Sequence, residues 1–145
     1  MKEHMRIKAI IEIPAGSLHK YEYDKDSGIL VLDRPLNQPI PYNYGYIPGT
    51  LCEDGDPLDV FVLTDSAIYP LTQVNIEILS VLKCRDNGSS DDKIIATLVG
   101  DSRGYEHMGT AIIKSYLETY KTGFEIIESG DKEEAIRTYE KSIQK

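Results

Sequence analysis

The hydrophobic pattern of this 145-residue chain changes its period late in the sequence. Up to Val99, short apolar runs are separated by turn residues, which is typical of β-strands. After Thr110, apolar residues recur every three or four positions, as they do on one face of a helix. Strands followed by helices predict an α+β fold. We expect a single domain over residues 1–145, with a small closed β-barrel at its centre and two C-terminal helices beside it.

The expected elements follow from this pattern. The turn signal Asp26-Ser27-Gly28 predicts a hairpin between 20–24 and 29–33, and a second turn is expected at 86–90. Segment 35–48 carries four prolines, so we expect an ordered loop there and not a regular central strand. Asp131 and Glu134 have the spacing of a capping box. The remaining strands are expected at 6–13, 58–64, 74–84 and 93–99, and the helices at 110–121 and 131–144.

Charge and composition exclude several classes of protein. The net charge of −8 argues against a general nucleic-acid-binding protein, which needs a basic surface. There is no apolar run of about 18 residues, so we expect no membrane span. The N-terminal residues lack the apolar region of a signal peptide, and two cysteines give no disulfide framework. A cytoplasmic location is therefore expected.

Three aspartates, Asp54, Asp56 and Asp59, fall within six residues directly before an apolar run. Carboxylates about 4 Å apart repel each other by roughly 4 kcal/mol at an effective dielectric of 20, so a fold that brings them together usually supplies a cation. Oxygen ligands without a nearby His or Cys cluster favour Mg²⁺, Mn²⁺ or Ca²⁺ over Zn²⁺. An EF-hand fits poorly, because its sixth position would be Asp59 and not Gly. On spacing alone, a polar turn with solvated acids stays open as an alternative.

A second group of acids and several cations could complete such a site. Asp86, Asp91 and Asp92 precede Lys93, and by themselves they are typical of a solvated hairpin tip. Arg34 lies between a predicted strand and Pro35, and its guanidinium suits bidentate phosphate binding. The other cations near a tyrosine or an aspartate are Lys20, Lys93 and Lys121.

Taken in order, these motifs resemble the family I soluble inorganic pyrophosphatases along nearly the whole chain. Asp54-Gly55-Asp56-Pro57-Leu58-Asp59-Val60 is similar to that family's signature metal motif. The other matching segments are Glu12-Ile13-Pro14-Ala15, Lys20-Tyr21-Glu22, Asp33-Arg34, Asn43-Tyr44-Gly45-Tyr46, the spacing of Asp86, Asp91 and Lys93, and Tyr120-Lys121.

The resemblance implies an OB-like closed barrel with the site in its mouth, and hydrolysis of pyrophosphate to two phosphates with several Mg²⁺ ions, for which Mn²⁺ is a substitute. It implies that Asp56 is the base acting on the attacking water. Glu12 would support the site. The implied metal ligands are Asp54, Asp59, Asp86, Asp91 and Glu22. The implied phosphate ligands are Lys20, Arg34, Tyr44, Lys93, Tyr120 and Lys121.

Three questions stay open at this point. A barrel that binds metal without catalysis is one alternative. A hydrolase of organic or nucleotide diphosphates is another, for which Tyr42 and Tyr46 would form the platform. A homo-oligomer is expected, but Ser115 and Thr119 stand where bacterial hexameric relatives tend to place histidines at a subunit contact. We therefore expect an assembly without that histidine cluster, and a hexamer is in doubt.

Overall fold

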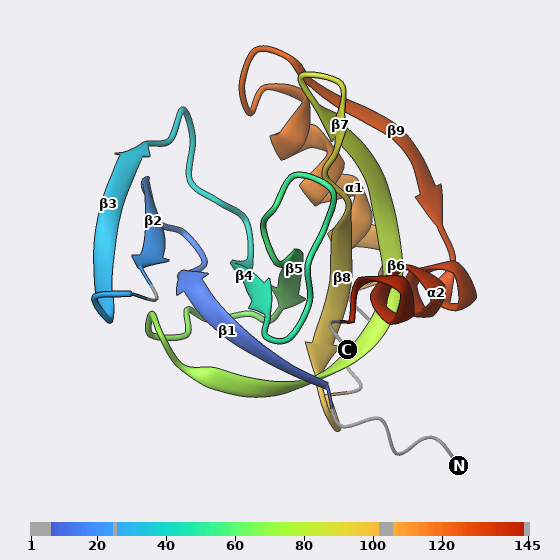
Figure 1. Ribbon diagram of the computed structural model, residues 1–145, viewed down its shortest axis with the longest axis horizontal. Helices are drawn as coiled ribbons and strands as arrows, with labels where there is room; N and C mark the ends of the chain where they lie inside the picture. Colours follow the sequence, from blue (N-terminus) through green and yellow to red (C-terminus); the bar gives the residue numbers. More distant parts are fainter. Residues whose placement is uncertain (1–6, 25, 102–105, 144–145) are drawn as a thin grey trace.

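A computed structural model describes the backbone of residues 7–24, 26–101 and 106–143. Arg6 and Gln144, at the ends of two expected elements, lie outside these ranges. Most of the described elements are strands, and the two helices follow in the last third of the chain (Figure 1). The elements are β1 (Ile7–Ile13), β2 (His19–Asp24), β3 (Ile29–Pro35), β4 (Asn43–Ile47), β5 (Leu58–Leu63), β6 (Gln73–Asp86), β7 (Ser89–Ser90), β8 (Lys93–Leu98), α1 (Glu106–Glu118), β9 (Phe124–Gly130) and α2 (Lys132–Ser142).

Five strands are hydrogen-bonded in a ring. The order runs β1-β4-β5-β8-β6, and β6 also pairs with β1. All of these pairings are antiparallel except that between β5 and β8, which is parallel. The strand β6 is 14 residues long, and its second half also pairs with β9 and with the short β7. It is therefore the strand that joins the ring to the C-terminal part of the chain.

The strands β5 and β8 are buried on both faces, which explains their continuous apolar sequences. Val60 and Val62 belong to one apolar cluster with residues of β1 and β6. Phe61, between them, belongs to a second cluster that packs against α1. Because side chains alternate along a strand, these two strands separate the two cores and contact both.

The structure corrects our expectation of a loop over 35–48. Residues 43–47 form β4, which is buried along its whole length and pairs with β1 and β5. The prolines lie outside this strand, so no ladder hydrogen bond is lost. Gly45 is needed here, because a Cβ at this position would lie 1.8 Å from the carbonyl oxygen of Ile10. The close approach of β1 and β4 at this glycine is what admits β4 into the sheet.

Two further boundaries differ from the sequence-based expectation. Strand β9, over Phe124–Gly130, was not expected, and it pairs with the second half of β6. Helix α1 begins at Glu106 and ends at Glu118, so it lies a few residues earlier than the expected 110–121. Tyr120 and Lys121 therefore lie in the turn after the helix, where Tyr120 donates its N–H to the carbonyl of Leu117 at 3.1 Å.

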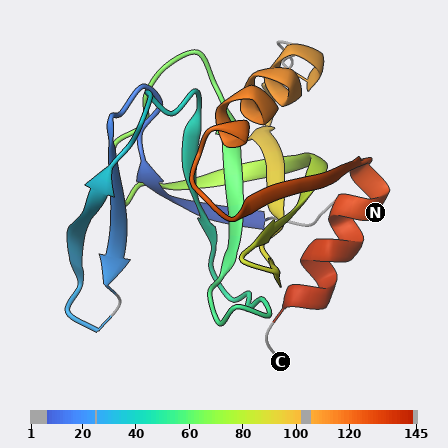
Figure 2. The same ribbon diagram turned by 90° about the horizontal axis from the view of Figure 1, so that it is seen from above.

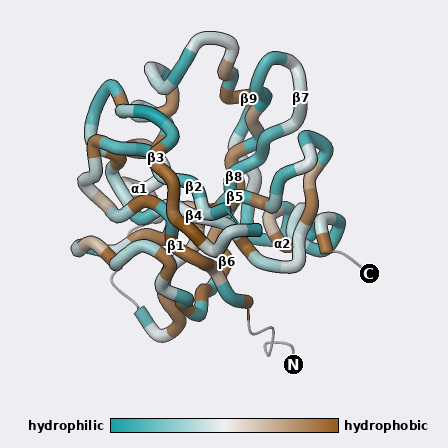
Figure 3. Tube along the Cα trace, turned by 60° about the vertical axis from the view of Figure 1, so that its left-hand side comes forward, coloured by the Kyte–Doolittle hydropathy of each residue, from teal (hydrophilic) through white to brown (hydrophobic). Residues whose placement is uncertain are grey.

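The expected hairpin of β2 and β3 is confirmed, and it forms a separate two-stranded sheet beside the ring (Figure 1). Gly28 has a φ of 71° in the turn, and the register shifts between Lys20 and Tyr21. Strand β3 begins with four apolar residues, as the hydropathy colours in Figure 3 show, although most of the strand is exposed. Its Ile29 and Leu32 are 58% and 56% exposed.

The two helices lie on the side of the molecule away from this hairpin (Figure 2). The expected cap of α2 is confirmed in part, since the Asp131 carboxylate accepts the N–H of Glu134 at 2.9 Å. At its other end, α2 is fixed to the loop before β5, because the Ser142 carbonyl accepts the N–H of Leu51 at 2.8 Å. In the described ranges no helix has the length and apolar character needed to cross a membrane.

Replacing Gly45 by Ala should destabilise the protein by about 3 kcal/mol or more, because β1 or β4 has to move to admit the methyl group. Urea unfolding followed by circular dichroism measures this loss. Gly49→Ala is the control, since a Cβ there meets no atom within 4 Å and only its φ of 81° is strained, at a cost of about 1 kcal/mol. Equal losses in the two variants would contradict the close approach.

Candidate functional site

The parallel pairing of β5 with β8 places Asp59 directly beside Lys93. The Lys93 Nζ lies 2.7 Å from Asp59 Oδ2 and 2.6 Å from the hydroxyl of Tyr44. Both Asp91 carboxylate oxygens lie 3.2 Å from the same ammonium. Strand β4 brings Tyr44 to this point, since it pairs with Phe61 two residues after Asp59. Strand register alone therefore gathers residues that are up to 49 positions apart.

The ammonium of Lys93 is almost completely buried, with 2% of the residue exposed. Burial lowers its pKa, but the carboxylates of Asp59 and Asp91 and the phenol of Tyr44 raise it, and the net pKa lies well above the ordinary value. Burial also raises the pKa of Asp91, and Asp59 adds to this while Lys93 opposes it. Lys93 therefore stays charged and compensates two carboxylates that would otherwise repel each other.

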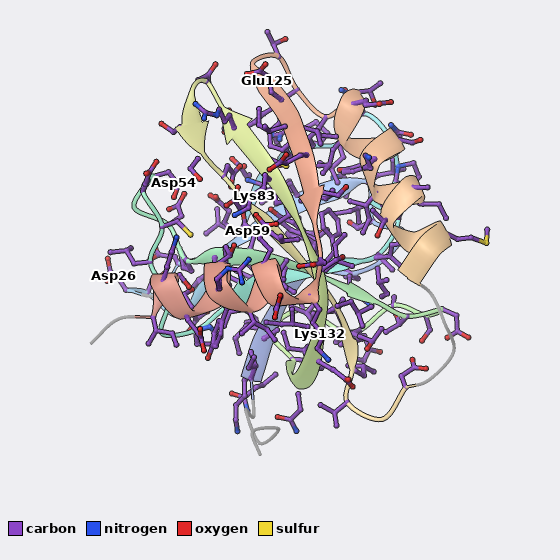
Figure 4. All side chains as sticks on the ribbon, turned by 90° about the vertical axis from the view of Figure 1, so that its right-hand side faces the viewer. Asp26, Asp54, Asp59, Lys83, Glu125 and Lys132 are labelled. Carbon is purple, nitrogen blue, oxygen red and sulfur yellow. The ribbon has the colours of Figure 1, made fainter. Side chains whose placement is uncertain are left out.

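The loop before β5 holds the other two aspartates of the motif. The Asp54 carboxylate accepts the N–H of Asp56 at 3.0 Å, and Gly55 between them has a φ of 87°. Burial raises the pKa of Asp56 above its ordinary value, and the negative charge of Asp54 raises it further. Figure 4 shows Asp54 and Asp59 above α2 in that view.

The turn between β6 and β7 brings a second acidic group to the same side. Asn87 and Gly88 both have positive φ, as a tight hairpin turn requires. The Asp86 carboxylate lies 2.7 Å from the ammonium of Lys121, which follows α1. Asp91 donates its N–H to the carbonyl of Cys84 at 2.9 Å, which places its carboxylate against Lys93.

The β2–β3 hairpin supplies the opposite wall. Lys20 lies 3.0 Å from the carboxylate of Asp33 and 3.6 Å from that of Glu22. Burial lowers the pKa of Lys20, but Tyr120 and these carboxylates raise it, and the net shift is upward. The guanidinium carbon of Arg34 lies 5.0 Å from the centre of the Tyr120 ring. Two segments far apart in the sequence therefore meet at Tyr120.

Glu12, on β1, is a partly buried acid at the base of this hairpin. Its carboxylate accepts the N–H of Tyr23 at 3.0 Å, which joins β1 to β2. Burial raises the pKa of Glu12 to about 7, the Tyr23 hydrogen bond opposes this, and Asp59 adds to it. Near neutral pH, Glu12 is therefore close to equal populations of its charged and neutral forms.

These residues line one cleft of about 790 Å³. Of the thirteen site residues expected from the sequence, all but Arg34 line it, and Arg34 packs over Tyr120 at its edge. The lining also contains Tyr46, which was considered as one half of an organic-group platform, and residues that were given no role in the site, namely Tyr21, Tyr23, Asp24, Asp26, Val31, Gly55 and Pro57. Alternation on β2 could have indicated Asp24, which follows Lys20 and Glu22 at intervals of two residues. Tyr42 does not line the cleft and packs instead against the apolar cluster beneath α1.

The donor atoms of this cleft suit a hard divalent cation, because they are carboxylate oxygens with no lining His or Cys. Within the described ranges, no three such side chains already converge on one point as metal ligands. Asp59 and Asp91 are instead paired with Lys93, and Asp86 with Lys121. The carboxylates therefore fit metal ions by the chemistry of their donor atoms.

The chain is similar to known proteins along most of its length. A family model described as inorganic pyrophosphatase matches residues 9–145. The chain belongs to the inorganic pyrophosphatase family. The inorganic pyrophosphatase of Corynebacterium glutamicum is 34% identical to it, over 97% of this chain and 98% of that protein. The solved structure of the inorganic pyrophosphatase from Thermus thermophilus is also similar. The match covers 99% of this chain and 92% of that chain, with a TM-score of 0.87 and 32% sequence identity.

Some other family members extend beyond the region that this chain matches. Soluble inorganic pyrophosphatase 2 of Chlamydomonas reinhardtii is 41% identical over 79% of this chain, and the match covers 65% of that protein. The chain also covers 61% of the inorganic pyrophosphatase of Halalkalibacterium halodurans, at 46% identity. It thus spans less than two thirds of these two relatives.

Replacing Glu12 by Gln should change how stability depends on pH in the absence of metal. The raised pKa means that the folded protein binds this proton more tightly than the unfolded chain. The resulting stabilisation of the folded state is complete below about pH 4.5. It is lost as the pH rises through about 7, and the free energy of unfolding then falls by up to about 3 kcal/mol. Glu12→Gln should remove this loss, so that the variant becomes more stable than the wild type at pH 8.

Urea unfolding with a chelator at pH 5 and pH 8 tests this prediction. Glu125→Gln, at an exposed position of β9, is the matched control and should follow the wild type. A Glu12→Gln variant with the wild-type pH dependence would show that Glu12 titrates normally.

Proposed function

We propose that this protein hydrolyses inorganic pyrophosphate to two orthophosphates, using Mg²⁺. The observation that carries the proposal is the single cleft in which five carboxylates of the expected metal site face three lysines and two tyrosines. Such a site resolves the problem of an anionic substrate approaching a protein of net charge −8. Family membership supports the same reaction.

The lysines and tyrosines of the cleft would hold the substrate. Lys20 and Lys121 are paired with Asp33 and Asp86 at distances of 3.0 and 2.7 Å, and both pairs are partly exposed. A phosphate oxygen can therefore replace the carboxylate in each pair. Lys93 is fixed between Asp59, Asp91 and Tyr44 and would present its charge without reorganisation. Arg34 and Tyr120 would bind from the hairpin side.

Asp56 would accept the proton of the attacking water. It lines the cleft, and both burial and the neighbouring Asp54 raise its pKa. A raised pKa makes a carboxylate a better base. Its N–H is held by Asp54, so the position of its backbone is fixed. Direct attack by water on phosphorus follows, and the leaving phosphate is stabilised by the cations.

The metal ligands would be Asp54, Asp59, Asp86, Asp91 and Glu22, with Mn²⁺ as a substitute for Mg²⁺. When bound, such ions lower the pKa of water and stabilise the charge of a transferring phosphoryl group. Lys93 balances Asp59 and Asp91 before the ions arrive. Asp54 and Glu22 lie on the two walls of the cleft, so several ions rather than one are expected.

The alternative functions gain no support from the site. An organic diphosphate needs an apolar platform, but Tyr42 packs into the core, so the expected pair of Tyr42 and Tyr46 does not form one. A barrel without catalysis would not need the full set of cations opposite the acids.

We also propose that residues 1–145 form one pyrophosphatase domain and that the strand ring is an OB-like closed barrel. The return pairing of β6 to β1 supports this. A homo-oligomer in the cytoplasm remains our prediction, without a histidine cluster at Ser115 and Thr119. In the structure Ser115 is exposed, and Thr119 accepts a hydrogen bond from Gln38 at 2.6 Å.

The purified protein should release phosphate from pyrophosphate with Mg²⁺, and a chelator should stop the reaction because it removes the ions that the carboxylates hold. A phosphate-release assay with pyrophosphate, ATP and ADP in parallel measures activity and selectivity. No release from magnesium pyrophosphate would refute the proposed function, and faster cleavage of ATP or ADP would favour an organic diphosphate as substrate.

Replacing Asp56 and Asp59 by Asn in separate variants should distinguish the role of a base from that of a metal ligand. Asp56→Asn removes basicity and should lower turnover by about 10²–10⁴-fold, with little change in Mg²⁺ affinity. Asp59→Asn removes one charge of the carboxylate cluster, so Mg²⁺ affinity should fall and added Mg²⁺ should recover part of the rate. Rates measured against Mg²⁺ concentration compare the two variants. Rescue of Asp56→Asn but not of Asp59→Asn would reverse these assignments.

A further inference from the structure

Asp92 belongs to the acidic group before Lys93, but it does not line the cleft and the proposed reaction gives it no task. Its side chain is nevertheless only 15% exposed. The N–H of Cys84 donates to its Oδ1 at 3.1 Å, and the ammonium of Lys83 lies 3.5 Å from its Oδ2. Because both oxygens of this carboxylate have a protein partner, Asp92 is a fixed part of the structure and not a solvated acid of a hairpin tip.

Asp91 and Asp92 lie between two ladders of β6. The pairing of β6 with β7 ends at Ser90, and its pairing with β8 begins at Lys93. Cys84 lies opposite this gap and uses both of its backbone polar groups there. Its carbonyl accepts the N–H of Asp91 at 2.9 Å, while its N–H donates to the Asp92 side chain. In this part of the connection, a side-chain hydrogen bond therefore does the work of a ladder hydrogen bond.

Lys83 connects the Asp92 carboxylate to α2 (Figure 4). Its ammonium donates to the hydroxyl of Thr138 at 3.0 Å. This hydroxyl in turn donates to the carbonyl of Glu134, one turn earlier in the helix, at 3.0 Å. A continuous series of polar contacts thus runs from α2 through Lys83 to Asp92, directly beside Asp91.

We propose that Asp92 is a positioning residue for Asp91, and that Lys83 and Thr138 hold Asp92 in place. This inference rests on the proposed function, in which Asp91 is a metal ligand. The Asp91 carboxylate is aimed at the ammonium of Lys93, with both oxygens at 3.2 Å. Since Asp91 and Asp92 are adjacent, the hydrogen bond from Cys84 to Asp92 limits the backbone rotation that would turn this carboxylate away. Groups that orient a metal ligand in this way typically contribute about 10–100-fold to metal affinity.

The effect of position can be distinguished from the effect of charge at Lys83. Loss of a positive charge near the site should by itself strengthen Mg²⁺ binding, because the two cations repel each other. Loss of the contact that holds Asp92 should weaken Mg²⁺ binding, because Asp91 then adopts orientations that do not face the ion. The proposed arrangement requires the weakening.

Calorimetry with Mg²⁺ alone, in the absence of substrate, tests the inference. Asp92→Ala should weaken Mg²⁺ binding about tenfold. Asp92→Asn keeps an oxygen for the N–H of Cys84 and should recover part of this loss. Lys83→Met should also weaken binding, by a smaller factor. Glu77→Gln is the matched control, because Glu77 and Lys132 also join β6 to α2, at 3.8 Å and away from the cleft, and it should leave Mg²⁺ affinity unchanged.

Rates of pyrophosphate hydrolysis should show the same division. The Mg²⁺ concentration that gives half of the maximal rate should rise in Asp92→Ala, while saturating Mg²⁺ should restore most of kcat. The reason is that Asp92 acts on the orientation of a metal ligand and not on Asp56 or on the phosphate ligands. A loss of stability alone would not shift the Mg²⁺ dependence of a folded variant.

The outcomes separate this inference from the proposed function. A wild type that is active and binds Mg²⁺, with the same affinity in Asp92→Ala, overturns the inference alone. So do equal losses in Asp92→Ala and Asp92→Asn, or tighter Mg²⁺ binding by Lys83→Met, because charge and not position would then be responsible. A wild type that neither binds Mg²⁺ nor hydrolyses pyrophosphate overturns both. Thermal unfolding confirms that the compared variants are folded, and if Asp92→Ala does not fold, the direction of the change in Lys83→Met decides.

Discussion

The buried ammonium of Lys93 is the interaction on which the rest of the site depends. It joins Asp59 of β5, Tyr44 of β4 and Asp91 of the β7–β8 connection, at distances of 2.6 to 3.2 Å. A charge in this position is stable only because two carboxylates surround it, and they in turn are tolerated side by side because of it. The register of the sheet therefore determines which charged side chains are paired at the site. If β5 and β8 slipped by one residue, Lys93 would leave Asp59 and point to the other face.

The outer part of the cleft contains further pairs of opposite charge. Lys121 compensates Asp86, and Lys20 compensates Asp33 and Glu22, so these acids also have a local cation. These outer pairs are partly exposed and worth little to stability, which leaves them free to exchange partners. The inner cluster is rigid and the outer pairs are adaptable. This gradient suits a site that must bind a multiply charged ligand together with its counter-ions.

Much of this could be predicted from the sequence, where the signal was local. The β2–β3 hairpin followed from its turn residues, and the strands β5 and β8 from their apolar runs. Strand β4 was missed because the surrounding prolines dominated the pattern, although none lies within 43–47. Strand β9 was missed because its sequence does not alternate strictly, since Ile126 and Ile127 are adjacent, and because it depends on β6 for pairing. The residues of the site were evident from motifs. The burial of Lys93 arises from strand register, and the packing of Arg34 on Tyr120 arises from the position of the end of α1. No local pattern in the sequence encodes either of these contacts.

The pairing of β1 with β6 has a consequence for how the chain reaches this structure. Ile7 pairs with Ile76, so β1 has only β4 as a partner until about half of the chain has left the ribosome. The ring is completed later, after about two thirds of the chain has emerged, because β8 ends at Leu98 and must still insert between β5 and β6. Contacts of such long sequence separation make folding slow, because loop entropy is lost before they form. The nascent chain therefore passes through a stage in which apolar strand edges are uncovered, and in which this protein is most exposed to aggregation and to chaperone binding.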